Sequence, residues 1–253
     1  MTIAYDVTGD GAAVLLLHST ACDRRMWDPQ VPVLADAGHL VVRCDLPGFG
    51  DTPMPVRPYD EPRDVLDLLD LLAVEEAAVV GSSGGGRIAL EVAARWPDRV
   101  AALALLCTAM AGHEPGAELR AYGDREDALL AAGDVAGATE LNVKTWLGPY
   151  ADDAARAKLR LMQRHAFEVQ LAAADEPPAL EVDADLTRIT ARSLLVSGAH
   201  DFADFREIAA HLAGFLPRAR HVELDWAGHL PSLERPDVVN DLLLDFLGAV
   251  SAR

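Results

Sequence analysis

The feature that most constrains the fold is a run of small residues, Gly81-Ser82-Ser83-Gly84-Gly85, between the apolar stretch Ala77 to Val80 and a helical segment from Arg87 to Trp96. The run matches G-x-S-x-G, a pattern that places a serine on a sharp turn between a strand and a helix. Such a turn strains the backbone at the serine and needs small neighbours, so that strand and helix can approach each other. The motif predicts a nucleophile at Ser83.

Two alternatives compete with this interpretation. Ser82 is the neighbouring serine, but its offset from the two glycines does not fit the pattern. A phosphate-binding loop would need the lysine of a P-loop or the spaced glycines of a dinucleotide fingerprint, and the run has neither. The sequence therefore favours Ser83 and a strand-turn-helix setting.

Short apolar stretches alternate with amphipathic segments along most of the chain, which is typical of a mainly parallel sheet covered by helices. The expected strands are Ala13 to Leu17, Leu40 to Cys44, Ala77 to Val80, Val100 to Leu106, Ser193 to Val196 and His221 to Leu224, with Ile3 to Val7 as an antiparallel edge strand. Helices are expected around Trp27 to Leu34, from Asp60 to Leu72, around Arg206 to Leu216 and from Pro236 to Val250. We predict an α/β fold whose mostly parallel sheet has eight strands or nearly so, with helices on both faces.

The pattern changes after Cys107, because no strong strand signal appears between Met110 and Leu186. Segments rich in alanine, leucine and charged residues fill this region and indicate helices; they are Arg125 to Ala132, Val135 to Trp146 and Asp153 to Ala174. We predict a core domain of residues 1–109 and 187–253, with residues 110–186 inserted in it as a helical cap.

A serine hydroxyl needs a base within hydrogen-bond reach, normally a histidine that a carboxylate holds in one tautomer. His229 follows the stretch His221 to Leu224, so it should lie at the carboxyl edge of the sheet beside Ser83. Asp201 follows Ser193 to Val196 and should reach the same edge. The chain order serine, aspartate, histidine is the one that this type of strand-turn-helix site uses.

Other residues could fill these roles. Asp204 is an alternative acid, although its position suits the cap of the following helix. The remaining histidines near these strands, His200, His211 and His221, are better explained as surface or strand-edge residues. We therefore favour Asp201 and His229.

A tetrahedral oxyanion needs two preorganised N–H donors. Gly84 follows the nucleophile and begins a helix, so its N–H is one candidate. The loop Ser19-Thr20-Ala21 after the first core strand should supply the other, and Thr20 is our choice. Cys22 lies in the same loop but has no base placed beside it, so we interpret it as a packed thiol.

Composition excludes several classes of protein. The formal net charge of −18 over 253 residues would repel DNA or RNA. Three widely spaced cysteines fit a reducing compartment and show no metal-ligand spacing, and Met1 to Gly11 does not look like a signal peptide. The apolar stretches are too short to cross a bilayer. We expect a cytoplasmic protein without nucleic-acid or membrane partners, and its oligomeric state carries no sequence signal.

Together these motifs resemble the α/β-hydrolase superfamily, and in particular its compact esterases and enol-lactonases. The segments that carry the resemblance are Leu15-Leu16-Leu17-His18-Ser19, Met26-Trp27-Asp28-Pro29-Gln30, Asp45-Leu46-Pro47-Gly48-Phe49-Gly50, Val80 to Gly86, Gly198 to Asp201, and Gly228-His229 with Glu234 and Pro236. The likeness covers most of the chain outside the cap. One departure is Ser19, which stands where the family usually has glycine.

The resemblance implies a serine hydrolase that acts on a small, apolar ester or lactone through an acyl-enzyme, with no metal or organic cofactor. Trp27, Trp146, Met110 and Met162 are candidates to line the substrate pocket, although such residues are also common in cores. The same three side chains could serve carbon–carbon bond hydrolysis, perhydrolysis or aminopeptidase chemistry. The fold is also compatible with a non-hydrolytic cyclase or a ligand receptor, which an intact serine, acid and histidine set disfavours.

Overall fold

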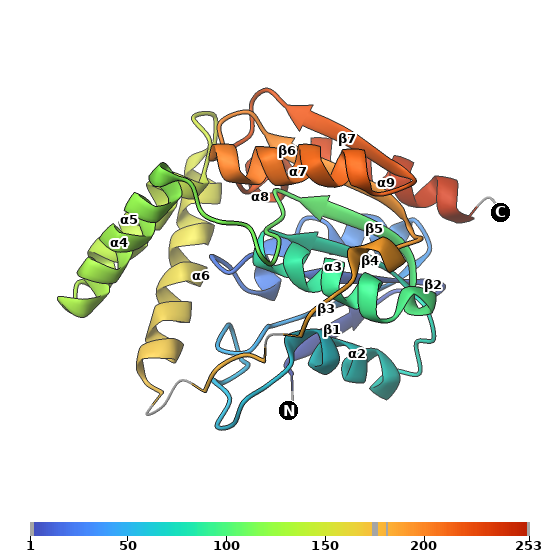
Figure 1. Cartoon of the computed structure of the whole chain (residues 1–253), viewed down its shortest axis with the longest axis horizontal. Helices are drawn as coiled ribbons and strands as arrows, with labels where there is room; N and C mark the ends of the chain where they lie inside the picture. The colour runs from blue at the N-terminus through green and yellow to red at the C-terminus, as the bar shows by residue number, and fades with distance from the viewer. Residues whose placement is uncertain (1–2, 174–176, 181, 252–253) are drawn as a thin grey trace.

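A computed structural model describes residues 3–173, 177–180 and 182–251, and within them one sheet has seven strands in the order β1-β3-β2-β4-β5-β6-β7 (Figure 1). The strands are β1 (Tyr5–Thr8), β2 (Ala12–Leu17), β3 (His39–Cys44), β4 (Ala77–Ser82), β5 (Val100–Leu106), β6 (Arg192–Gly198) and β7 (Ala219–Leu224). β1 pairs with β3 in antiparallel fashion, and every other pairing in this sheet is parallel. The predicted fold class is confirmed, with seven strands rather than eight.

The central strands are buried on both faces, which explains their continuous apolar sequence. Every residue of β4 is buried, and Val79 pairs with Leu15 of β2 on one side and Leu103 of β5 on the other. Successive side chains of these strands enter different cores: Val79 belongs to one apolar cluster and Val80 to the other. The sheet therefore carries a hydrophobic core on each face.

Helices cover both faces of the sheet (Figure 1). Their bounds are α1 (Val31–Asp36), α2 (Glu61–Leu71), α3 (Gly84–Arg95), α4 (Ala117–Ala131), α5 (Val135–Trp146), α6 (Asp153–Leu171), α7 (Ala203–Phe215), α8 (Pro231–Glu234) and α9 (Pro236–Ser251), with 3-10 turns η1 (Arg24–Trp27), η2 (Pro97–Arg99) and η3 (Leu186–Arg188). Residues of α2, α3 and α7 pack in one core, and residues of α1 and α9 in the other. No helix among the described residues is both long and apolar enough to span a bilayer.

The region around Trp27 to Leu34 is two elements instead of one short helix. Asp23 caps the 3-10 turn η1 by accepting a hydrogen bond from the Arg25 N–H, and α1 starts only at Val31. Proline lacks an N–H and fixes its own φ, so it suits the first turn of a helix, and α1 has one there. Similarly, α3 begins at Gly84, directly after Ser83, rather than at Arg87.

Three helices, α4, α5 and α6, lie between β5 and β6 in the chain and on one side of the sheet in space (Figure 1). α4 buries none of its residues, whereas α5 and α6 each bury one face. The expected helix Asp153 to Ala174 ends at Leu171, and Ala174 itself is outside the described residues. The division into a core and a cap at residues 110 and 186 stays a prediction.

Candidate active site

Ser83 sits on a strained turn between β4 and α3. Its backbone has φ 54° and ψ −118°, a region that a residue with a side chain rarely adopts. The turn is held from several sides, since the Ser83 N–H donates to the Leu106 carbonyl at 3.0 Å and the Ser83 carbonyl accepts from the Gly86 N–H at 2.9 Å. Strain of this kind persists only where surrounding bonds fix it, and it is concentrated at functional sites.

The glycine at the end of the motif permits this turn. A Cβ added to Gly85 would lie 2.4 Å from the His18 carbonyl oxygen and 2.6 Å from that of Leu17. Both neighbours are backbone atoms of β2 and its following loop, so neither can move aside easily. Only glycine lets α3 approach the sheet this closely.

Ser83, His229 and Asp201 form one chain of hydrogen bonds, although they come from three distant parts of the sequence. The Ser83 Oγ lies 2.7 Å from Nε2 of His229, and Nδ1 of His229 lies 2.7 Å from Oδ2 of Asp201. A carboxylate accepts from the Nδ1–H, which leaves Nε2 free to accept the serine proton. This geometry is the one that general-base activation of a serine requires.

The imidazole is held in a mostly apolar environment. The ring centroid of His229 lies 4.5 Å from that of Trp146 and 4.1 Å from that of Phe205. The side chains of His229 and Asp201 are each 1% exposed, and Ser83 as a residue is 6% exposed. Low exposure strengthens the hydrogen bonds along this chain, because water competes less for their atoms.

Asp204, the alternative acid, has a different partner. Its Oδ1 lies 3.0 Å from Nε2 of His113 and accepts the Gly116 N–H at 2.5 Å. The carboxylate therefore fastens the segment that leads into α4 to the start of α7. Asp201 is the acid that contacts His229.

Cys107 also lies beside this chain of hydrogen bonds. Its Sγ, a carboxylate oxygen of Asp201 and a ring nitrogen of His229 all lie within 4.8 Å of one another, a spacing that could hold a metal ion. A metal would have to displace the hydrogen bonds that both ring nitrogens of His229 already make. Burial, and then the charge of Asp201, raise the pKa of the Cys107 thiol well above its usual value, so the thiolate ligand is disfavoured.

The two predicted oxyanion donors lie next to each other. A Cβ added to Gly84 would lie 2.6 Å from Cγ2 of Thr20, so the loop after β2 touches the first turn of α3. Within the described part of the chain, neither the Gly84 N–H nor the Thr20 N–H donates a hydrogen bond. An oxyanion formed at Ser83 would need unpaired N–H groups, and these two neighbouring residues each have one.

Ser19, at the position where related sequences usually have glycine, is accommodated by hydrogen bonds within the same loop. It is buried, its Oγ accepts the Ala21 N–H at 3.2 Å, and its carbonyl accepts the Cys22 N–H at 2.8 Å. The serine thus stabilises the turn that carries Thr20.

His18 fixes the start of this loop, a contact that the sequence analysis missed. Its Nε2 accepts the Leu46 N–H at 2.8 Å, so its Nδ1 carries the proton and donates to the Ser19 carbonyl at 2.8 Å. Burial lowers the pKa of His18, so the ring stays neutral. The sequence signals were its place directly after an apolar strand and its part in a segment that resembles the family.

Glu234 holds the loop that carries His229. Its Oε1 accepts the Gly228 N–H at 3.0 Å, and its Oε2 accepts the Gly148 N–H at 3.1 Å. The His229 N–H donates to the Trp146 carbonyl at 2.9 Å, so the loop is joined to the end of α5 at two points. Burial raises the pKa of Glu234 despite these N–H bonds. Sequence reasoning noted Glu234 only as part of a motif.

The residues that the sequence suggested for the substrate pocket lie in different parts of the structure. Trp27 is completely buried in the core, whereas Trp146 is 9% exposed and packs against His229. Met162 is also buried in the core. Met110 lines a pocket of about 780 Å³ beside α3.

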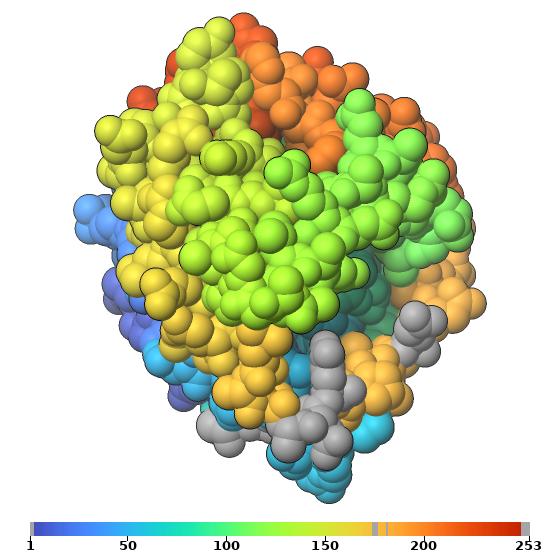
Figure 2. Space-filling model, turned by 90° about the vertical axis from the view of Figure 1, so that its left-hand side faces the viewer, coloured from blue at the N-terminus to red at the C-terminus, as the bar shows by residue number. Residues whose placement is uncertain are grey.

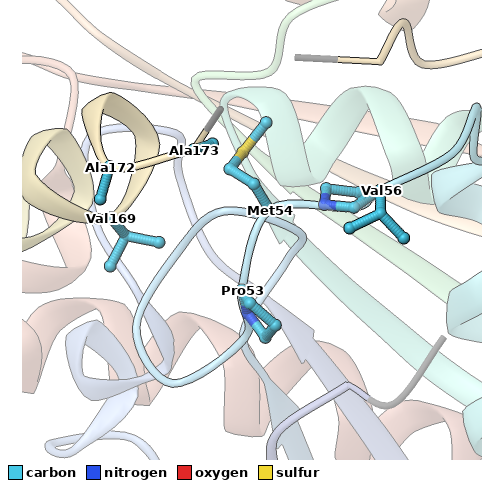
Figure 3. A pocket seen from close by; sticks show the side chains of 7 residues that line it. Pro53, Met54, Val56, Val169, Ala172 and Ala173 are labelled. Carbon is cyan, nitrogen blue, oxygen red and sulfur yellow. The ribbon is translucent and has the colours of Figure 1, made fainter. Parts of the chain in front are cut away.

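A second pocket, of about 350 Å³, lies between the loop after β3 and the end of α6 (Figure 3). Pro53, Met54 and Val56 come from the loop, while Val169 belongs to α6. The lining side chains are apolar, and neither Ser83 nor His229 is among them.

Comparison with known proteins places the chain among hydrolases. A sequence profile described as "Alpha/beta hydrolase family" matches residues 14–242. A relative from Variovorax paradoxus, described as "Putative carbamate hydrolase RutD", is 33% identical over 100% of this chain and 98% of its own length. A 2-hydroxy-6-oxononadienedioate/2-hydroxy-6-oxononatrienedioate hydrolase from Paraburkholderia phymatum is 29% identical over 98% of this chain and 91% of its own.

Solved structures show the same fold along nearly the whole chain. The enol-lactonase from Burkholderia xenovorans is 28% identical, with a TM-score of 0.80, and the match covers 97% of this chain and 96% of that one. A hydrolase from Pseudomonas aeruginosa is 29% identical, with a TM-score of 0.79, over 97% and 94% of the two chains.

Proposed function

The chain belongs to the α/β-hydrolase family and is a hydrolase, and on this basis we propose that it is a serine hydrolase that cleaves a small ester or lactone. The observation that carries the proposal is the hydrogen bond of 2.7 Å between Ser83 Oγ and His229 Nε2, continued by that of 2.7 Å from His229 to Asp201. The names of related proteins, among them an enol-lactonase, support the substrate class.

In the proposed mechanism, His229 removes the Ser83 proton while Ser83 Oγ attacks the carbonyl carbon of the substrate. Asp201 keeps the imidazole in the productive tautomer and stabilises its charged form. The N–H groups of Gly84 and Thr20 stabilise the oxyanion. The protonated His229 then donates to the leaving alcohol, and water releases the acyl group in a second, equivalent step.

A second candidate is hydrolysis of a carbamate or of a carbon–carbon bond. The Variovorax paradoxus relative is described as a carbamate hydrolase, and the Paraburkholderia phymatum relative as a hydrolase of an oxo-dienedioate. Attack by Ser83 would be common to all three reactions, and only the leaving group would differ.

A fluorophosphonate probe and p-nitrophenyl acetate test the proposal directly. We expect the probe to label Ser83, and Ser83→Ala to lose both labelling and turnover while keeping the circular dichroism spectrum of the wild type. Ser82→Ala is the matched control: its hydroxyl is buried without a hydrogen-bond partner among the described residues, so its removal should leave turnover intact. Hydrolysis retained by Ser83→Ala would refute the assignment.

A further inference from the structure

The pocket of about 780 Å³ lies beside α3, where Arg87, Leu90 and Glu91 line it. Residues of α3 and of the start of the β5–α4 segment line it, as do Ala179, Leu180, Val182, Asp183, Ala184 and Leu186. Figure 2 shows a hollow on this side of the molecule, beneath the helices drawn in green and yellow-green. Ligand pockets in proteins have comparable volumes.

This pocket adjoins Ser83. Arg87 and Leu90, which line it, are four and seven residues after Ser83, a spacing that places residues on one face of a helix. On the other wall, the Ala109 N–H donates to the Ser83 carbonyl at 3.0 Å, and Met110 is the next residue. Neither Ser83 nor His229 lines the pocket, and Arg87, its first lining residue on α3, is about one helical turn (about 5 Å along the axis) beyond the nucleophile.

Most of the residues that line the pocket are apolar, although polar groups also contribute to its surface. Leu90, Met110, Leu180, Val182 and Leu186 line the pocket, and of these Leu180 and Val182 are exposed. An aliphatic or aromatic group that entered here would cover apolar side chains that otherwise contact water, which is favourable.

Negatively charged side chains outnumber positively charged ones around this pocket. Its only cation, among the lining residues described, is Arg87, and the Arg87 guanidinium donates to both Glu61 and Glu91. Glu91 lines the pocket, as does Asp183, for which no salt bridge is formed within the described chain. Because two carboxylates already pair with the Arg87 guanidinium, it is not available to bind a substrate carboxylate.

Building on the proposed hydrolase function, we propose that this pocket binds the acyl part of the substrate and selects an uncharged apolar group over one that ends in a carboxylate. The inference rests on the apolar lining residues, on the pairing of Arg87 with two carboxylates, and on the exposed Asp183, all close to the nucleophile turn. A neutral chain gains by covering the exposed Leu180 and Val182, whereas a terminal carboxylate would approach Glu91 and Asp183.

Two series of p-nitrophenyl esters test the proposal. From acetate to hexanoate, kcat/KM should rise by about fourfold for each methylene that the pocket buries. The hydrogen adipate ester, which has the same chain length as hexanoate but ends in a carboxylate, should be about tenfold or more slower than hexanoate. Fluorophosphonate labelling of Ser83 on the same preparation measures the fraction of active protein.

Two variants test whether the substrate preference arises in this pocket. Asp183→Lys should raise the adipate-to-hexanoate ratio by about tenfold, while Asp241→Lys, with the same change in net charge on the surface of α9, should leave it unchanged. Met110→Trp should lower the hexanoate-to-acetate ratio by narrowing the pocket. Leu171→Trp, at an exposed position that lines none of the pockets described, is its control.

The outcomes separate this inference from the function on which it rests. If Ser83 is labelled and acetate is hydrolysed, yet chain length has no effect or adipate is the better substrate, the pocket assignment is wrong while the hydrolase proposal stands. Equal changes in Asp183→Lys and Asp241→Lys would also overturn it, because the net charge would then explain the preference. Absence of labelling and turnover would overturn both.

Discussion

Removal of the Glu234 carboxylate should disturb catalysis through the loop that carries His229. In Glu234→Ala, the N–H groups of Gly228 and Gly148 lose their acceptor in a buried site. Each unsatisfied buried donor costs about 1–3 kcal/mol, so the free energy of unfolding should fall by about 2–6 kcal/mol. Glu234→Gln keeps one acceptor oxygen and the shape of the side chain, and should lose about 1–3 kcal/mol.

The effect on turnover follows from the position of His229 next to Gly228. A displacement of about 1 Å at a catalytic group can cost about a hundredfold in rate. We therefore expect kcat for p-nitrophenyl acetate to fall by about 10- to 100-fold in Glu234→Ala and less in Glu234→Gln. KM should change little, because Glu234 is only 7% exposed and lines none of the pockets described.

Urea unfolding and steady-state kinetics on the same preparations provide the test, with Glu207→Gln, an exposed carboxylate on α7, as the control. Because burial raises the pKa of Glu234, the folded state binds its proton more tightly than the unfolded state does. The stability of the wild type relative to Glu234→Gln should therefore decrease as the pH rises above about 4.5. A folded Glu234→Ala protein with wild-type kcat would refute this positioning role.

Three further outcomes are expected. The bidentate contact with Arg95 lowers the pKa of Asp60, so Asp60→Asn should cost about 1 kcal/mol at neutral pH, and this difference should disappear as the pH falls below about 4 in acid unfolding curves; an equal loss at pH 2 would contradict it. Gly85→Ala should unfold at least about 10 °C lower in calorimetry, because its Cβ would meet the His18 carbonyl; an unchanged Tm would show that the turn can relax. The three cysteines are free and buried, and burial raises the pKa of Cys44 to about 12, so a disulfide reagent at pH 8 should react with them only after unfolding, and rapid reaction of the native protein would speak against the packing.

Much of the fold was predictable because its signals are local. The alternation of apolar strands and helices gave the parallel sheet, and β5 has the bounds expected from sequence. Helix starts were less accurate: α3 begins at Gly84, where three consecutive glycines conceal a helix that packing against the sheet stabilises. Propensity alone places that start later, at Arg87.

The candidate site was only partly predictable. Motif and chain order pointed to Ser83, Asp201 and His229, and the structure brings these three together, although their catalytic roles remain a proposal. The sequence distinguished Asp201 from Asp204 less clearly than it identified Ser83. The contacts of Glu234 were missed, and of the residues around the pocket beside α3 only Met110 was named, because their partners lie far away in the chain and are fixed only by packing.

The sequence by itself determined the strand-turn-helix motif at Ser83 and the type of sheet that presents it, because both depend on residues that are close along the chain. Tertiary structure alone decided which side chains meet there. Ser83 and His229 are 146 positions apart, and a hydrogen bond of 2.7 Å between them depends on how β4, β7 and α5 pack together. Such a distance is the sum of many contacts, none of which a local pattern encodes.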